Sequence, residues 1–134
     1  MIKGYVKAEM HRWAFHYTEE SGFITITAGF GARRWKMAIS CVENMITCYA
    51  AYPRETIFEN RAGVLELLNE LNAATGFGSY FLLDAEKGGL IVFRCDILIA
   101  DEYSIVECFA EGIKRLSAAF SARWEVLISH LHEW

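Results

Sequence analysis

The sequence predicts an α+β domain with an antiparallel sheet of about five strands and helices mainly on one face of that sheet. Three observations lead to this fold class. Several short segments alternate between two sets of side chains, as half-buried strands do. Short turns join neighbouring segments into hairpins, whose strands are antiparallel. Two longer segments repeat apolar residues every three or four positions, as helices do. The 134 residues suit one domain, expected over residues 1–134.

The first half of the chain is predicted to contain one short helix and a group of strands. The helix is expected over residues 3–11, and the apolar segment that follows is a candidate strand that ends in a turn at residues 18–22. A loop at residues 29–34 and a two-residue turn at Glu43–Asn44 separate the next strands, and Pro53 ends the last one because it lacks a backbone N–H. The candidate strand and the three strands after it cover residues 13–17, 23–28, 35–42 and 45–52.

The second half is predicted to follow the order helix, two strands, helix. Asn60 is expected to cap a helix that runs to about Ala74, and a hairpin follows with strands over residues 79–83 and 90–97. Both faces of this hairpin are apolar, which predicts cover on both sides. Ser104-Ile105-Val106-Glu107 has the pattern of a capping box before the last helix. If that helix ran unbroken to Leu131 it would span roughly 42 Å. We therefore expect it to bend near residues 117–121 or to overhang the domain.

Apolar periodicity also predicts the core and one polar contact. One of the amides of Asn69 and Asn72 is expected to bond to backbone near residues 76–80, with a ligand contact as the alternative. The predicted core consists of Ile24, Ile26, Ile39, Cys41, Ile46, Val64, Leu68, Leu71, Phe93, Phe109 and Leu116.

Composition and charge exclude several classes of protein. Apolar residues make up 54% of the chain, so disorder is excluded, and the net charge of −4 argues against a general binder of nucleic acid or of anionic membranes. The sequence has no apolar stretch of transmembrane length and no signal-peptide pattern, so we expect a cytoplasmic protein. The four cysteines are interpreted as reduced core thiols, with a Cys41–Cys48 disulfide as the rival interpretation.

No pattern of catalytic or metal-ligating residues is apparent, so we expect neither a cofactor nor a metal. The four histidines lack the spacing of a zinc site, and no nucleophile has a base at a familiar spacing. Arg33 and Arg34 follow the segment Gly29-Phe30-Gly31, where backbone amides and two guanidinium groups could hold an anion. Two solvated arginines in a hairpin loop are the simpler interpretation.

The segment Arg61–Asn72 is followed by Tyr80–Asp84 and Gly89–Arg94, that is, by a leucine- and asparagine-rich helix and an aromatic-rich hairpin. In these features the chain resembles the YbjN family of bacterial sensory transduction regulators, whose fold is similar to that of type III secretion chaperones. The resemblance implies a non-enzymatic domain, often dimeric, that acts by binding. It supplies no catalytic residues.

Two functions are therefore considered. The first is a homodimeric regulatory or chaperone-like adaptor that binds a polypeptide. The expected interface is the outer face of the second hairpin, with a further contact on the last helix, and comprises Tyr80, Leu82, Val92, Arg94 and Trp124. The alternative is a sensor of a small anionic ligand, or an enzyme of unknown reaction. Its site would lie between the sheet and a helix, where Arg33, Arg34 or Arg94 would contact the anion.

Overall fold

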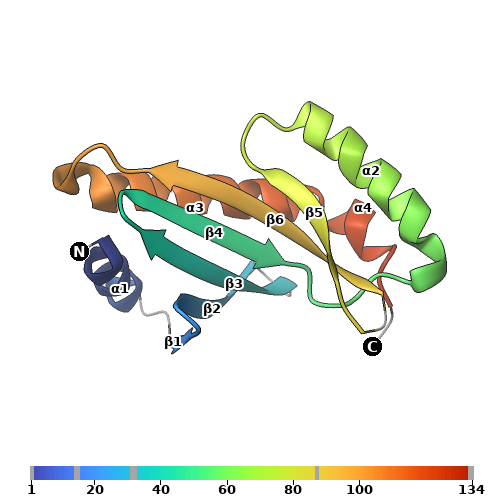
Figure 1. Cartoon of the computed structure of the whole chain (residues 1–134), viewed down its shortest axis with the longest axis horizontal. Coiled ribbons are helices and arrows are strands. Elements are labelled where there is room, and N and C mark those ends of the chain that lie inside the picture. Colours follow the sequence, from blue (N-terminus) through green and yellow to red (C-terminus); the bar gives the residue numbers. More distant parts are fainter. Residues whose placement is uncertain (1, 14–15, 31–32, 87, 133–134) are drawn as a thin grey trace.

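A computed structural model of the chain describes residues 2–13, 16–30, 33–86 and 88–132. Its helices are α1 (Ile2–Arg12), α2 (Arg61–Ala74), α3 (Ile105–Ala122) and α4 (Trp124–Ile128), with short 3-10 turns η1 (Phe58–Asn60) and η2 (Glu102–Ser104). The strands are β1 (Tyr17–Glu20), β2 (Phe23–Phe30), β3 (Arg33–Val42), β4 (Met45–Ala51), β5 (Ser79–Asp84) and β6 (Gly89–Leu98). They form one antiparallel sheet in the order β1-β2-β3-β4-β6-β5 (Figure 1).

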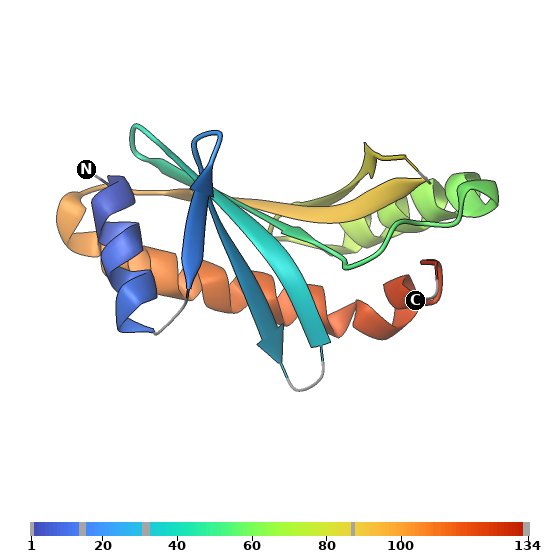
Figure 2. The same cartoon turned by 90° about the horizontal axis from the view of Figure 1, so that it is seen from below.

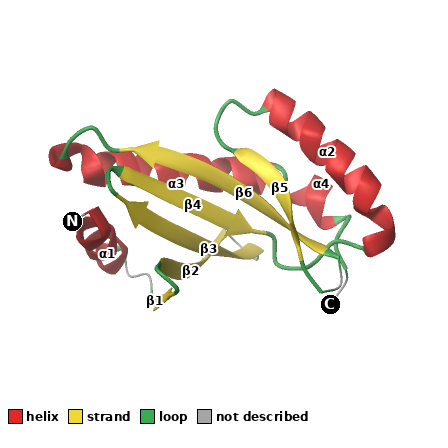
Figure 3. Cartoon of the chain, viewed as in Figure 1, coloured by secondary structure: helices red, strands yellow, loops and turns green. Residues whose placement is uncertain are grey.

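The helices lie mainly on one side of the sheet. Helix α3 packs against β4 and β6, and α1 packs against α3 and β3 in the same layer (Figure 2). Helix α2 lies beside β5 at the edge of the sheet (Figure 3). In the described part of the chain no helix covers the other side, which faces the viewer in Figure 1 and is called the open face below. The predicted α+β class is confirmed, with six strands in place of about five.

The N-terminal strand lies later in the chain than the sequence predicted. Trp13 is not in a strand, because α1 continues to Arg12 and the Trp13 ring stacks on Phe109 of α3 with 5.5 Å between ring centroids. Strand β1 begins at Tyr17, so part of the predicted turn is extended chain. Its Glu19 pairs with lysines of α1, which gives an acidic strand residue a partner. Residues 14–15 lie outside the described residues.

The predicted loop at residues 29–34 is largely strand. β2 continues to Phe30, β3 begins at Arg33, and residues 31–32 lie outside the described residues. The hairpin extends because Arg33 ties it to the helix layer: its guanidinium donates to the backbone and side-chain oxygens of Ser121, both at 3.0 Å, and to Glu125 at 2.8 Å.

The start of the last helix also differs from the prediction. Ser104 makes no side-chain hydrogen bond to cap α3, so the predicted capping box is wrong. The turn η2 intervenes, and Asp101 caps that turn by accepting from the Ser104 N–H at 3.0 Å. The predicted bend exists, but it lies at Arg123, between the end of α3 and the start of α4.

The core lies between the sheet and the helix layer. Nine of the eleven predicted core residues are buried, and the other two, Cys41 and Leu71, are half-buried and pack against the edge of the core. All four cysteines are free, and the register places Cys48 opposite Ile39 and Cys95 instead of opposite Cys41. The rival disulfide interpretation is therefore wrong.

Asn72 holds the edge strand β5 against α2. Its side-chain amide donates to the Tyr80 carbonyl at 2.9 Å and accepts from the Tyr80 N–H at 2.6 Å, whereas Asn69 is exposed. The expectation that one amide bonds to backbone is confirmed. An edge strand otherwise presents unpaired backbone groups. The two hydrogen bonds thus replace a neighbouring strand at this position.

Replacing Asn72 by alanine is expected to lower the free energy of unfolding by about 2 kcal/mol, because two hydrogen bonds to partly buried backbone are lost together. Asn69→Ala on the same helix is the matched control and should change it by about 0.5 kcal/mol or less. Urea denaturation followed by circular dichroism measures both. Equal effects of the two substitutions would contradict the assigned role of Asn72.

Candidate functional site

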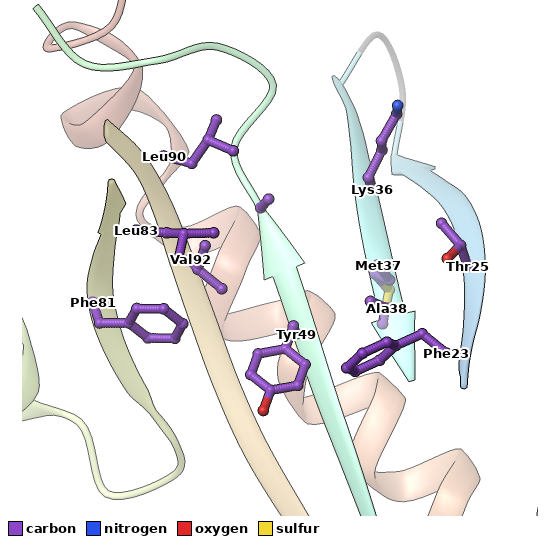
Figure 4. A pocket seen from close by; sticks show the side chains of 11 residues that line it. Phe23, Thr25, Lys36, Met37, Ala38, Tyr49, Phe81, Leu83, Leu90 and Val92 are labelled. Atoms are coloured by element: carbon purple, nitrogen blue, oxygen red, sulfur yellow. The ribbon is translucent and has the colours of Figure 1, made fainter. Parts of the chain in front are cut away.

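The candidate site is a groove on the open face of the sheet. Alternate residues of each strand point to this face, and the strand register aligns them in rows across the sheet. The groove has a volume of about 400 Å³. Its lining side chains are shown in Figure 4 and belong to Phe23, Thr25, Lys36, Met37, Ala38, Tyr49, Ala51, Phe81, Leu83, Leu90 and Val92.

Small side chains form the floor of the groove and aromatic rings close one of its ends. Ala38 and Ala51 lie opposite larger residues of the neighbouring strands, so they leave space between β2 and β5. The rings of Phe23 and Tyr49 meet edge to face at 6.1 Å between centroids, and those of Tyr49 and Phe81 at 6.5 Å. Such contacts between aromatic rings are favourable. They hold the rings in place while one side of each remains available to a bound molecule.

Charged groups lie at the margins of the groove. The Arg94 guanidinium lies 5.6 Å from the centroid of the Tyr49 ring and 3.4 Å from an Asp96 carboxylate oxygen. Thr47 donates to the same oxygen at 2.8 Å. Lys36 stands at the end opposite the aromatic rings, and no ion pair with it occurs among the described residues (Figure 4). The interior of the groove therefore suits apolar groups, and its rim can accept charged ones.

A second apolar feature lies at the far end of the open face. Val42, Met45 and Leu98 are aligned across β3, β4 and β6, and we call them the tip row. Their side chains are 63%, 36% and 64% exposed, respectively. Large apolar side chains so exposed, at paired positions on adjacent strands, are typical of interaction surfaces.

The structure divides the predicted interface between two faces. Leu82 lies opposite Ile91, and Tyr80 lies opposite Phe93, so both point towards the helix layer. Val92 and Arg94 belong to the open face, although Val92 is only 4% exposed beneath its neighbours. The five predicted residues therefore do not form one surface.

Trp124, the fifth predicted residue, belongs to an aromatic cluster on the helix side. Its ring lies 6.1 Å from Trp35 and 5.7 Å from Tyr52, and the Arg33 guanidinium stands 5.7 Å from its centroid. Tyr52 stacks on Phe120 at 3.8 Å and donates its hydroxyl to the Phe120 carbonyl at 2.7 Å. Burial raises the pKa of Tyr52 well above its ordinary value. Through this cluster the β2–β3 hairpin packs against α3 and α4.

Arg33 and Arg34, the two candidate anion contacts, have different hydrogen-bond partners. Arg33 already has an acidic partner in Glu125, and Arg34 donates to the Arg33 carbonyl at 2.9 Å. An anion contact by Arg33 would have to compete with Glu125 and Ser121. A role of Arg33 and Arg34 in ligand binding stays a prediction.

Sequence reasoning missed the aromatic side chains that shape the groove. The period-two alternation of a strand places Phe23 and Ile24 on opposite faces of β2, and Phe81 and Leu82 on opposite faces of β5. Tyr49 belongs to neither the predicted core nor the predicted interface. Alternation within each strand therefore indicates the face of each aromatic residue. It does not indicate that β2, β4 and β5 present these residues on the same face of one sheet.

The described residues contain no cluster of three or more histidine, cysteine, aspartate or glutamate side chains that could hold a metal ion. Within the same residues, no helix has the length and apolar character needed to span a membrane.

A comparison with protein-family models matches residues 8–120 to YbjN, described as "Putative bacterial sensory transduction regulator". The chain belongs to the YbjN family. The resemblance noted in the helix and hairpin between Arg61 and Arg94 is therefore confirmed. The family carries the description of a regulator, and a role in regulation or binding is consistent with the apolar groove.

The fold is also that of a solved YbjN structure. The crystal structure of YbjN from E. coli, described as "a putative transcription regulator", superposes with a TM-score of 0.72. The match covers 91% of this chain and 89% of that chain, at 13% sequence identity. At this identity the likeness shows a common fold. A search of curated proteins found no significant match.

Proposed function

We propose that the protein is a non-enzymatic regulatory protein that acts as a chaperone-like adaptor and binds a polypeptide partner on its open face. Membership of the YbjN family supports a regulatory role. The groove is the observation that carries the proposal, because it leaves apolar side chains of five strands uncovered by any described helix. Four free cysteines support a reducing compartment, and the proposed location is the cytoplasm.

The chemistry of the groove favours binding over catalysis. Carbon atoms dominate the lining, and its only titratable side chains are Lys36 and Tyr49. These two lie at opposite ends of the groove in Figure 4. Aromatic residues in partly enclosed positions are the anchors that dominate protein interfaces. A sheet also holds such anchors on a rigid support, which reduces the entropy lost when a partner binds.

The alternative function, a sensor of a small anion or an enzyme with a site between sheet and helix, has weaker support. A cleft of about 450 Å³ does lie between β2, β3 and α3, lined on the helix side by Lys114, Ser117 and Ser121. Arg33, however, is held by Ser121 and Glu125, so one predicted anion contact serves the fold.

Capture of a partner from a bacterial lysate tests the proposal. Leu83→Asp places a charge in the groove at a position that is 51% exposed, so the fold should tolerate it. Leu65→Asp on α2, at a position that is 45% exposed, is the matched control. We expect the wild type and the control to capture the same protein, and Leu83→Asp to capture it about ten-fold less well.

Two results would contradict the proposed function. One is equal capture by the folded Leu83→Asp variant. The other is a metabolite that raises the melting temperature by several degrees, with an effect lost in Lys114→Ala and no specific protein captured. That second result would favour the sensor function instead.

A further inference from the structure

The groove on the open face continues past Lys36 into a second hollow of about 370 Å³. Lys36, Ala51 and Leu90 line both spaces, so the two are joined. The hollow lies where β3 begins and β4 ends, and its other lining residues include Arg34, Trp35 and Pro53. The aromatic rings close the opposite end of the groove (Figure 4). The two ends of the joined space therefore differ in character.

The end formed by the hollow offers positive charge and hydrogen-bond donors. Lys36 and Arg34 are the charged side chains of its lining, and among the described residues no acidic side chain lines the groove or the hollow. Lys36 is exposed and forms no ion pair within the described part of the chain. The indole N–H of Trp35 is buried without a described acceptor. This local charge is opposite in sign to the net charge of −4, and a recess strengthens its attraction for anions.

Asp96, the acidic residue on the margin of the groove, does not neutralise Lys36. Its carboxylate accepts from Thr47 at 2.8 Å and from Arg94 at 3.4 Å, and its register partner is Thr47. Thr47 lies four residues before Ala51 on β4, and Ala51 is the register partner of Lys36. At the rise of a strand, four residues separate the two pairs by roughly 13 Å. The charge of Lys36 is thus left for a bound molecule.

The distance between this charge and the apolar interior limits what can bind. Lys36 and Ala38 point to the same face of β3 and stand two residues apart, roughly 6.6 Å. Ala38 is small and is paired with Tyr49, so there is space above it beside an aromatic ring. A polypeptide with a large apolar side chain above Ala38 brings another of its side chains beside Lys36. That residue is two positions away in an extended segment and about four away in a helix.

We infer that the groove and the hollow select an acidic amphipathic segment of a polypeptide. An aromatic or large apolar residue of this segment lies above Ala38, and an aspartate or glutamate two to four positions away pairs with Lys36. The inference rests on the proposed function, since it takes the groove as the polypeptide-binding surface, and it adds the chemistry of the bound segment. The apolar anchor supplies most of the affinity, and the charge distinguishes this segment from equally apolar ones.

Selection from a library of short random peptides displayed on phage tests this specificity. We expect the wild type to enrich peptides with an acidic residue two to four positions from an aromatic residue or a leucine. Lys36→Glu should enrich lysine or arginine at that position instead, because the charge of the site is reversed. Lys114→Glu is the matched control, since Lys114 is an exposed lysine of α3 on the other side of the sheet. It should keep the acidic preference.

The affinity of the peptide that is enriched most gives the size of the effect. Replacing its acidic residue by the matching amide should raise the dissociation constant for the wild type about two- to five-fold, the range of an exposed ion pair. The same replacement should lower the dissociation constant for Lys36→Glu, because it removes a repulsion. Fluorescence polarisation measures both values, and the two effects should shrink as the salt concentration rises. Circular dichroism checks that each variant is folded.

Enriched peptides without an acidic preference, or a preference that Lys36→Glu leaves unchanged, would overturn the inference. The proposed function would stand in that case if the neutral variant Leu83→Asn lowered the enrichment, because the groove would still bind the peptides. Enrichment that Leu83→Asn leaves unchanged would overturn both, since the peptides would then bind elsewhere. A wild type that enriches no peptide overturns the inference, and capture from the lysate decides the proposed function separately.

Discussion

Replacing Leu68 by alanine is expected to lower the free energy of unfolding by about 2–5 kcal/mol, the range for truncating a buried leucine. Leu68 is buried in the core, on the face of α2 that also contributes Val64. Removing three carbon atoms there leaves a cavity, because the surrounding strands and helices are too closely packed to collapse into it. Urea denaturation, with the slope of the transition checked for constancy, measures the change.

Leu65 provides the control for this measurement. It lies about one turn earlier on α2, and it is 45% exposed. Leu65→Ala removes the same atoms from the same helix, so any change in helix propensity is shared. Its effect should be about 0.5 kcal/mol or less. If both variants unfold at the denaturant concentration of the parent, the buried face of α2 is wrongly assigned.

The core could be predicted because burial follows apolar periodicity closely. Val64 and Leu68 are spaced for one face of a helix, and Ile24 and Ile26 for one face of a strand. Each of these pairs lies within a single element, so no knowledge of the tertiary fold is needed to place both residues on one side. The structure buries all four.

Element ends were harder to predict, because distant contacts decide them. The strand end at Arg33 depends on Ser121 and Glu125, which are close in space but 88 and 92 positions away in the chain. Asp101 displaced Ser104 as a capping residue because an extra turn precedes α3. Neither arrangement has a local pattern that separates it from the alternative.

The predicted interface was misplaced because the pairing register of β5 with β6 could not be read from the sequence. In the second hairpin Leu82 lies opposite Ile91, so Val92 shares a face with Phe81. The turn between the strands has several residues, and a shift of one residue in the pairing would have joined Leu82 and Val92 instead. The sequence showed that both faces were apolar. It did not show which residues of the two strands belonged to the same face.

Gly78→Ala is expected to lower the free energy of unfolding by about 2–4 kcal/mol, for two reasons that add. Gly78 has a φ of +76°, which strains any residue with a Cβ. A Cβ at this position would also lie 2.5 Å from the Arg94 carbonyl oxygen and 2.5 Å from the Phe93 ring. The carbonyl belongs to the backbone of β6, so it cannot move aside cheaply.

Gly76→Ala is the matched control, since Gly76 lies in the same connection but has open space around its Cα. That change should alter stability by about 0.5 kcal/mol or less. Gly78 directly precedes β5, whose Phe81 and Leu83 line the groove. Gly78→Ala should therefore also weaken binding on the open face, even where most molecules remain folded. If the Gly78→Ala variant were as stable as the Gly76→Ala variant, the backbone conformation assigned to Gly78, directly before β5, would be wrong.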